Sequence, residues 1–256
     1  MSAGDAGIAR PRLQTPFRWA GEQIAVTLPG ATGLFTTRLG GVSEGPFARL
    51  NLGLATDDDR ERVAANRERV AAYAQLTVAS FAGGRQVHGA RVQRHERPPD
   101  GGRREEADGH ATARENVAPI VLTADCLPVL IVGAGAVVAL HAGWRGLAAG
   151  ILEQGVRTLR ELGADGPLVA AIGPAAGACC YEVGDEVRGA LGEPAAAPGG
   201  DRRIDLKAIA RVQLAAAGSD GVHDVGLCTI CSPGLFFSHR RDGAPTGRQA
   251  GIVWRS

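Results

Sequence analysis

The sequence predicts a mixed fold of the α/β (α+β) class, because two kinds of periodic segment alternate along the chain. In three segments apolar residues return every three or four positions, as they do in helices that cover a core. Seven shorter apolar runs are bounded by glycine, proline or polar residues, which is typical of strands. The 256 residues, 45% of them hydrophobic, suffice for one large core, so we expect a single catalytic domain over residues 16–256.

The individual elements can be assigned in chain order. Residues 1–15 lack periodic hydrophobicity and are predicted to form a disordered N-terminus. Strands are expected at 33–37, 120–123, 127–132, 136–141, 168–172, 235–239 and 251–254. Helices are expected at 60–74, 147–162 and 206–217, and Gly163 and Gly218 are expected to stop the last two. Segments 97–109 and 192–203 are expected to be surface loops.

Composition excludes several classes of function. The 28 basic residues are spread among 27 acidic ones, for a net charge of +1, so a nucleic-acid partner is not expected. The longest apolar run, 127–140, is interrupted by glycines and is shorter than the roughly 20 residues that span a bilayer, so no membrane partner is expected. The N-terminus lacks the apolar core of a secretory signal, and the cysteine count of 5 is odd. We therefore expect a cytoplasmic protein with reduced thiols.

The segment 123–146 carries the chemistry that is most visible in the sequence. Two apolar runs flank the glycine-containing residues 133–135, which predicts a β-hairpin with a short turn. In the expected register Leu127 lies opposite His141, and Cys126 lies beside this pair. Cross-strand neighbours are roughly 5 Å apart at Cβ, so Cys126 and His141 can converge on one metal ion, and a register slip of one residue would keep them close.

A third metal ligand has to come from another part of the chain. The best candidate is His88, which is followed by Gly89, a residue that allows another group to approach closely. One cysteine and two histidines suit zinc, and three protein ligands leave a fourth position open, as in catalytic sites. Each residue also has a structural interpretation, because a buried cysteine behaves as a small hydrophobe and a strand histidine is often only hydrogen-bonded.

Further candidate residues lie next to this group. Arg145 follows His141 where a helix is expected to begin, so its guanidinium and the free helix amides could hold a phosphate. Asp125 precedes Cys126 and is a candidate acid or base, although a turn or hydrogen-bonding role is equally compatible with its position. Cys228 and Cys231 have CxxC spacing, but no second pair stands nearby in the sequence. We interpret them as packing or turn residues.

Six motifs resemble those of one known family. They are TTRLGGVSEGPFARLNLG at 36–53, QVHG at 86–89, ADCLP at 124–128, HAGWRG at 141–146, CCYEVG at 179–184 and FFSHRRDG at 236–243. In this order they resemble the YfiH-like, laccase-domain family, also called the polyphenol oxidase or purine nucleoside phosphorylase family. The resemblance covers most of the chain. The sequence departs from the family pattern at Arg49, Ala175 and Ala176, which affects the expected substrate preference but not the metal ligands.

The resemblance implies a layered α/β/β/α fold with mixed sheets and a zinc site formed by His88, Cys126 and His141. It implies phosphorolysis of adenosine, inosine, guanosine and methylthioadenosine, together with adenosine deamination, so the expected partners are purine nucleosides and phosphate. Asp125, Cys126 and Arg241 are the expected catalytic residues, with Asp125 as a proton shuttle in deamination. Arg38, Asn51 and Arg145 are the expected substrate or phosphate contacts.

Three other functions remain open from the sequence. A copper-dependent phenol oxidase is the first, since Cys and His also bind copper, but multicopper chemistry requires more histidine than the 6 residues present. A cysteine hydrolase or deamidase with Cys126 as nucleophile and His141 as base is the second. A zinc-stabilised module that binds a protein partner is the third.

Overall fold

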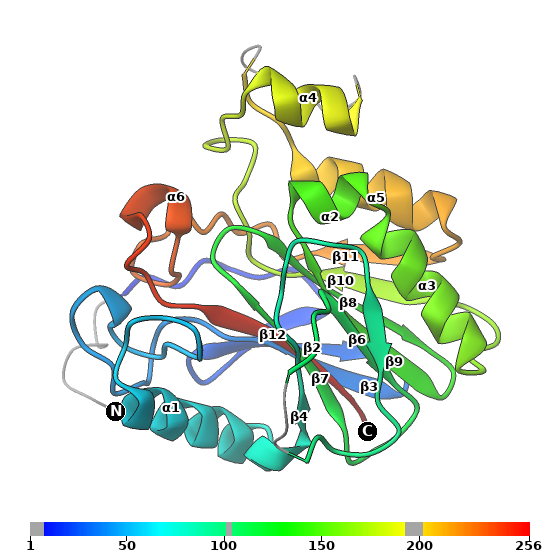
Figure 1. The fold of residues 1–256 in the computed structure, drawn as a ribbon, viewed down its shortest axis with the longest axis horizontal. Coiled ribbons are helices and arrows are strands. Elements are labelled where there is room, and N and C mark those ends of the chain that lie inside the picture. Colours follow the sequence, from blue (N-terminus) through cyan, green and yellow to red (C-terminus); the bar gives the residue numbers. More distant parts are fainter. Residues whose placement is uncertain (1–7, 101–103, 193–201) are drawn as a thin grey trace.

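The structure is a computed structural model that describes residues 8–100, 104–192 and 202–256 (Figure 1). Of the predicted disordered N-terminus, residues 1–7 lie outside the described residues. Residues 8–15 have no regular structure, yet Ile8 and Leu13 pack against a core cluster and Trp19 Nε1 donates to the Pro11 carbonyl over 2.9 Å.

Two six-stranded mixed sheets form the centre of the molecule. The first has the order β1 (Phe17–Ala20), β2 (Gln23–Leu28), β3 (Ala31–Phe35), β12 (Gln249–Arg255), β7 (Ala118–Thr123) and β4 (Phe81–Ala82). The second has the order β11 (Gly221–Asp224), β10 (Val169–Ile172), β8 (Leu127–Gly133), β9 (Ala136–Ala142), β6 (Gly109–Thr112) and β5 (Val92–Arg94). Three pairs are parallel, namely β4 with β7, β5 with β6 and β10 with β11, and the other pairs are antiparallel.

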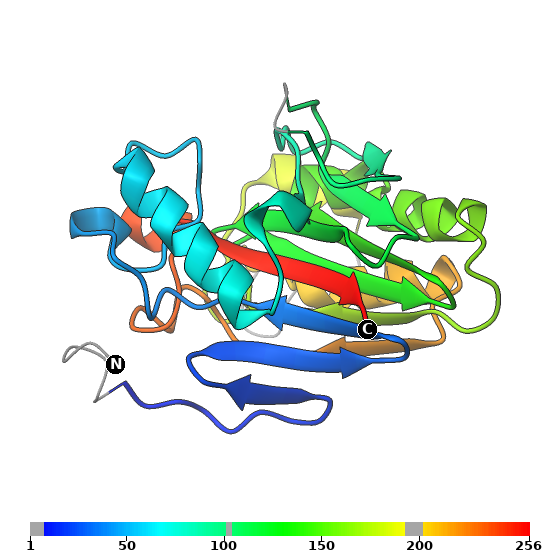
Figure 2. The same ribbon diagram turned by 90° about the horizontal axis from the view of Figure 1, so that it is seen from below.

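Six helices are present in the described residues, and some of them cover the two outer faces of the sheets (Figure 1). They are α1 (Arg60–Tyr73), α2 (Trp144–Ala148), α3 (Ile151–Glu161), α4 (Asp185–Leu191), α5 (Leu206–Ala216) and α6 (His239–Asp242), with short 3-10 turns at Gly45–Phe47 and Val78–Ser80. Val70 of α1 packs against the outer face of the first sheet, whereas α3 and α5 cover the second (Figures 1 and 2). Within the described residues no helix has the length and apolar character needed to cross a membrane. The layers are therefore α/β/β/α, as expected.

Successive side chains of β8 point to opposite faces of the second sheet, so this one strand contributes residues to two core clusters. Val129 and Ile131 pack under α3 and α5, while Leu130 and Val132 face the first sheet and contact a separate cluster that includes Phe35. A strand that is buried on both faces needs apolar residues at every position. The unbroken apolar run at 127–132 is thus typical of a central strand.

Most predicted elements are confirmed, and three are wrong in whole or in part. The expected surface loop 97–109 is wrong at its end, where Ala107 and Asp108 are buried and β6 begins at Gly109; residues 101–103 and 193–201 of the two expected loops lie outside the described residues. The predicted helix 147–162 is interrupted at Gly150, whose φ of 81° ends α2 and separates it from α3. The predicted strand 235–239 has no ladder partner, because the Phe237 amide donates to the Gln249 side chain and Ser238 caps α6. Gly163 and Gly218 have φ values of 87° and 94° and follow α3 and α5 as expected.

Candidate active site

The β8–β9 hairpin places Cys126 and His141 together, in a register one residue away from the expected one. Gly133 pairs with Ala136 and Pro128 with His141, so the turn has two residues and not three. Gly135, at a φ of 80°, closes this tighter turn, and Gly133 remains part of the ladder. The expected pairing of Leu127 with His141 is therefore wrong, but the expected proximity of Cys126 and His141 is confirmed because both stand at the open end of the hairpin.

His88 completes the group from a separate loop. One ligand atom each from His88, Cys126 and His141 lie within 4.8 Å of one another. The rings of His88 and His141 meet edge to face, with centroids 4.8 Å apart. Gly143, directly after β9, allows this approach, because a Cβ at that position would lie 2.9 Å from Cys126 Sγ and 3.2 Å from His88 Cδ2.

Asp108 holds two of the three side chains in place. Its carboxylate accepts hydrogen bonds from the backbone amides of Val87, His88 and Gly89 at 2.9–3.0 Å and lies 2.7 Å from His141 Nδ1. Asp108 is fully buried. The bond to Nδ1 leaves Nε2 of His141 directed at the metal-binding group, an arrangement common among histidine ligands. Sequence analysis missed Asp108 because it lies in a segment predicted to be a surface loop.

The electrostatics of the group favour a thiolate. Burial raises the pKa of Cys126, but the charge of His141 and hydrogen bonds from His141 and His88 outweigh it, so the pKa lies below its ordinary value. For His141, burial lowers the pKa, while the Cys126 thiolate and Asp108 raise it above the ordinary value. A thiolate beside two imidazoles is a donor set that zinc prefers, and zinc would displace the proton shared by this pair. The residues present therefore fit the metal that the sequence predicts.

The group opens into a large cationic cavity of about 1230 Å³. Its lining includes two carboxylates, Asp58 and Asp125, and the aromatic rings of Trp144 and Tyr181. Six arginines also line it: Arg60, Arg85, Arg104, Arg145, Arg240 and Arg248. Arg145 lies over the Trp144 ring at 4.1 Å and Arg240 over the Tyr181 ring at 4.8 Å, so two of these cations pack on aromatic rings of the cavity wall. Such a cavity suits an anionic ligand with a planar group.

Two expected substrate contacts, Arg38 and Asn51, and the expected catalytic residue Arg241 have other partners. The Arg38 guanidinium donates to the carbonyls of Ala48 and Pro233 and lies over the Phe237 ring. The Arg241 guanidinium donates to the carbonyls of Thr229, Ile230 and Phe236. Through these hydrogen bonds the two arginine side chains hold neighbouring loops together and do not donate to the cavity.

Asn51 is the third of these residues and is fully buried. Its Oδ1 accepts from the amides of Gly53 and Arg248 at 2.9 and 2.8 Å. Arg145 does line the cavity, but α2, in which it is the second residue, has only five residues, so the contribution of the helix dipole is small.

Asp125 lines the cavity next to Cys126 and has a φ of 91°, which is unusual for a residue with a side chain. Its carboxylate accepts from Thr229 Oγ1 at 2.6 Å, from Ser238 Oγ at 3.0 Å and from the Arg240 amide at 2.7 Å. These three bonds fix the backbone turn that presents Cys126. They also join the hairpin to the loops before α6.

Comparison with known proteins identifies the family. A sequence model of the family described as "Multi-copper polyphenol oxidoreductase laccase" matches residues 32–256. The chain belongs to this family. Purine nucleoside phosphorylase YlmD of Geobacillus stearothermophilus is 39% identical over 249 residues, which cover 88% of this chain and 90% of that protein. Purine nucleoside phosphorylase PA4543 of Pseudomonas aeruginosa is 40% identical, covering 86% of this chain and 91% of that protein.

The fold agrees with a solved family member. The crystal structure of Bacillus licheniformis hypothetical protein YfiH superposes with a TM-score of 0.86 at 32% identity, and the match covers 95% of this chain and 100% of that one. The layered fold that the motifs implied is therefore shown for this family member.

Proposed function

We propose that the protein is a zinc-dependent purine nucleoside phosphorylase that also deaminates adenosine. The observation that carries the proposal is the union of two features in one cavity: the His88–Cys126–His141 group and a wall of six arginines. The printed names of relatives that are about 40% identical over most of the chain support the same activity.

His88, Cys126 and His141 would hold the zinc ion. Bound there, zinc supplies a Lewis acid with one open position, which can orient a substrate oxygen or activate water. Copper is a weaker candidate for the phenol-oxidase chemistry that the family description names. Among the described residues two groups could hold a metal, and only one of them contains histidine, whereas multicopper chemistry needs several histidine-rich sites.

In phosphorolysis a phosphate oxygen attacks C1′ of the ribose, the bond from C1′ to the purine nitrogen breaks, and the purine leaves with the electron pair and takes up a proton. The protein has to hold a polyanion beside a sugar that develops positive charge. We assign phosphate binding to Arg145, Arg240 and Arg248, and we place the purine between the aromatic walls formed by Trp144 and Tyr181.

The remaining predicted residues act in this proposal through others. Asn51 positions the backbone of Arg248, and Arg38 and Arg241 hold the loops that border the cavity. Asp125 is the cavity-lining carboxylate adjacent to Cys126 and the candidate for proton transfer in deamination, but its bonds to Thr229 and Ser238 assign it first to positioning Cys126.

The test measures release of free base from adenosine, inosine, guanosine and methylthioadenosine, with and without phosphate, together with zinc content. We expect phosphate-dependent release that Cys126→Ala abolishes and that Arg248→Ala lowers by about 100-fold, the usual effect of removing one charge-stabilising group. Arg157→Ala, an exposed control on α3, should behave as wild type. Ammonia release from adenosine in phosphate-free buffer tests the deaminase activity separately.

The opposite result would identify a different chemistry. A zinc-free protein that releases no base but is rapidly alkylated at Cys126 would replace this proposal by the cysteine-hydrolase alternative, in which His141 acts as base. Copper retained at one equivalent together with oxidation of phenols would replace it by the oxidase.

A further inference from the structure

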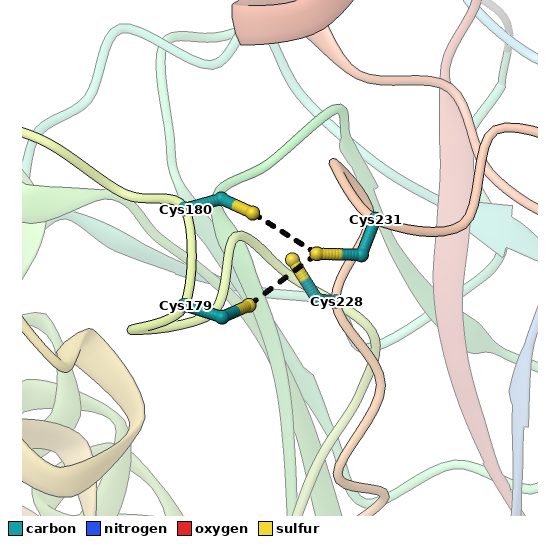
Figure 3. Close-up of side chains that lie close together, drawn as sticks. All are labelled: Cys179, Cys180, Cys228 and Cys231. Carbon is teal, nitrogen blue, oxygen red and sulfur yellow. Dashed lines mark hydrogen bonds between the residues drawn. The ribbon is translucent and has the colours of Figure 1, made fainter.

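Four cysteines outside the active site come together on the surface (Figure 3). Cys179 and Cys180 follow β10, and Cys228 and Cys231 lie between β11 and α6. Sγ of Cys231 lies 2.9 Å from that of Cys180 and 3.4 Å from that of Cys179, and the four sulfurs lie within 4.8 Å of one another. The CxxC pair, which has no second pair nearby in the sequence, therefore has one in the folded chain, and its residues stand in a turn as expected.

Backbone pairing brings the two segments together and shapes the cluster. The Ala175 amide donates to the Leu227 carbonyl, and the Thr229 amide donates to the Ala175 carbonyl over 3.0 Å. The Gly177 amide donates to Cys228 Sγ at 3.3 Å. Gly177 also leaves room for the sulfurs, because a Cβ there would lie 3.2 Å from Cys179 Sγ.

The arrangement matches one tetrahedral thiolate site. Zinc binds thiolate at about 2.3 Å, so sulfurs at the corners of a tetrahedron are about 3.8 Å apart. This value lies between the separation of 2.9 Å from Cys180 to Cys231 and the 4.8 Å within which all four sulfurs lie. Packing does not explain the cluster, since Cys179 and Cys231 are exposed and all four thiols are unbridged. A single disulfide would leave two sulfurs without a role.

We propose that Cys179, Cys180, Cys228 and Cys231 bind a second zinc ion in a closed, structural tetrathiolate site. Four protein ligands leave no open position, so this ion takes no part in the reaction. It joins the segment that carries the cavity residue Tyr181 to the segment that carries Thr229.

The link to the cavity passes through neighbouring residues. Tyr181, directly after Cys180, lines the cavity and carries the Arg240 guanidinium on its ring. Thr229, between Cys228 and Cys231, donates to Asp125. The second ion thereby fixes both Tyr181 and the turn before Cys126.

The test is the metal content of the full chain, purified under reducing conditions and compared among three proteins. Wild type is expected to hold two zinc ions, Cys126→Ala to keep one, and Cys179→Ser/Cys231→Ser to lose one while retaining the other at the histidine-containing site. In the Cys126→Ala protein, Co²⁺ exchanged for zinc should give the intense sulfur-to-metal charge-transfer absorption of a tetrathiolate site. That absorption should be absent when Cys231→Ser is added.

Two outcomes would overturn the proposal. One is a Cys126→Ala protein that is folded by circular dichroism but binds neither zinc nor Co²⁺. The other is a count of two missing free thiols in unfolded, metal-stripped wild type, which would identify a disulfide in place of a metal. If Cys179→Ser/Cys231→Ser does not fold, the Co²⁺ spectrum of Cys126→Ala decides alone. If the active-site metal is lost, wild type holds fewer zinc ions per chain, but the Co²⁺ spectrum of Cys126→Ala stays the same. The two metal sites are therefore tested separately.

Discussion

At the scale of single residues, Asp108 determines whether His88 and His141 are preorganised. It orients His141 through Nδ1 and holds the loop of His88, whose φ of 61° lies in the left-handed region, through three consecutive amides. The buried Asp108 carboxylate accepts four hydrogen bonds, which use all its acceptor positions. A substitution of Asp108 therefore removes hydrogen bonds from His141 and from the loop of His88 at the same time.

Asp108→Asn is therefore expected to weaken zinc binding at the active site by about 10- to 100-fold, the usual effect of removing a partner of a histidine ligand. Each carboxylate oxygen accepts two donors, so the amide NH₂ that replaces one of them would leave two of the four donors without an acceptor. Competition with a chromophoric chelator measures the affinity, and Asp165→Asn, at an exposed position, serves as control. An unchanged affinity would show that Asp108 is structural only.

At the scale of secondary-structure elements, α1 connects the outer layer to the cavity. Asn66 of α1 accepts from the Val42 amide and donates to the carbonyls of Arg49 and Asn51. Asn51 in turn holds the backbone of Arg248. The helix thus positions a cavity residue through a buried amide network, although its own side chains lie mostly outside the site.

The start of α1 offers a direct test of this element. Asp59 Oδ1 accepts from the amides of Glu61 and Arg62 at 2.8 and 3.0 Å, so Asp59 is the N-cap. Asp59→Ala should lower the free energy of unfolding by about 1 kcal/mol. Glu68→Ala, at an exposed position of the same helix, should change it by less than about 0.5 kcal/mol. Urea denaturation of both variants measures this, and equal effects would contradict the capping role.

At the scale of the whole molecule, the second sheet buries a histidine pair that makes stability depend on pH. His110 in β6 is fully buried, and its Nδ1 lies 3.0 Å from Nε2 of His95. The pKa of His110 is lowered to about 3, chiefly by burial; the charges of His95, Arg104 and Arg91 act in the same direction, and that of Asp108 opposes them. The pKa of His95 is also lowered, chiefly by burial, with Glu105 opposing.

Between pH 6.5 and 3 the unfolded chain therefore binds a proton at His110 that the folded protein excludes. The free energy of unfolding should fall as the pH decreases through this range, by up to about 1.4 kcal/mol per pH unit from His110. His110→Gln should lose less stability than wild type between pH 7 and pH 5 in urea denaturation. Identical pH slopes for the two proteins would exclude His110 as the cause.

The sequence predicted the parts of the site that depend on neighbouring residues. Cys126 and His141 are joined by one hairpin, so their proximity follows from a turn and a strand pattern even though the expected register was wrong by one residue. His88 was a candidate from the neighbouring Gly89 and from the resemblance to the family, since its partners are far along the chain and no local pattern joins them.

The rest was decided by tertiary structure, because it depends on contacts between distant segments. Asp108 meets His141 across 33 residues, and Cys180 meets Cys231 across 51. The parallel pairing of β10 with β11 and the bridge from Ala175 to Cys228 create the cysteine cluster. No local periodicity reports such pairings, since they follow from the packing of complete sheets. The sequence by itself determined the class of fold, the family and the donor types, and the three-dimensional packing of two sheets decided which donors meet.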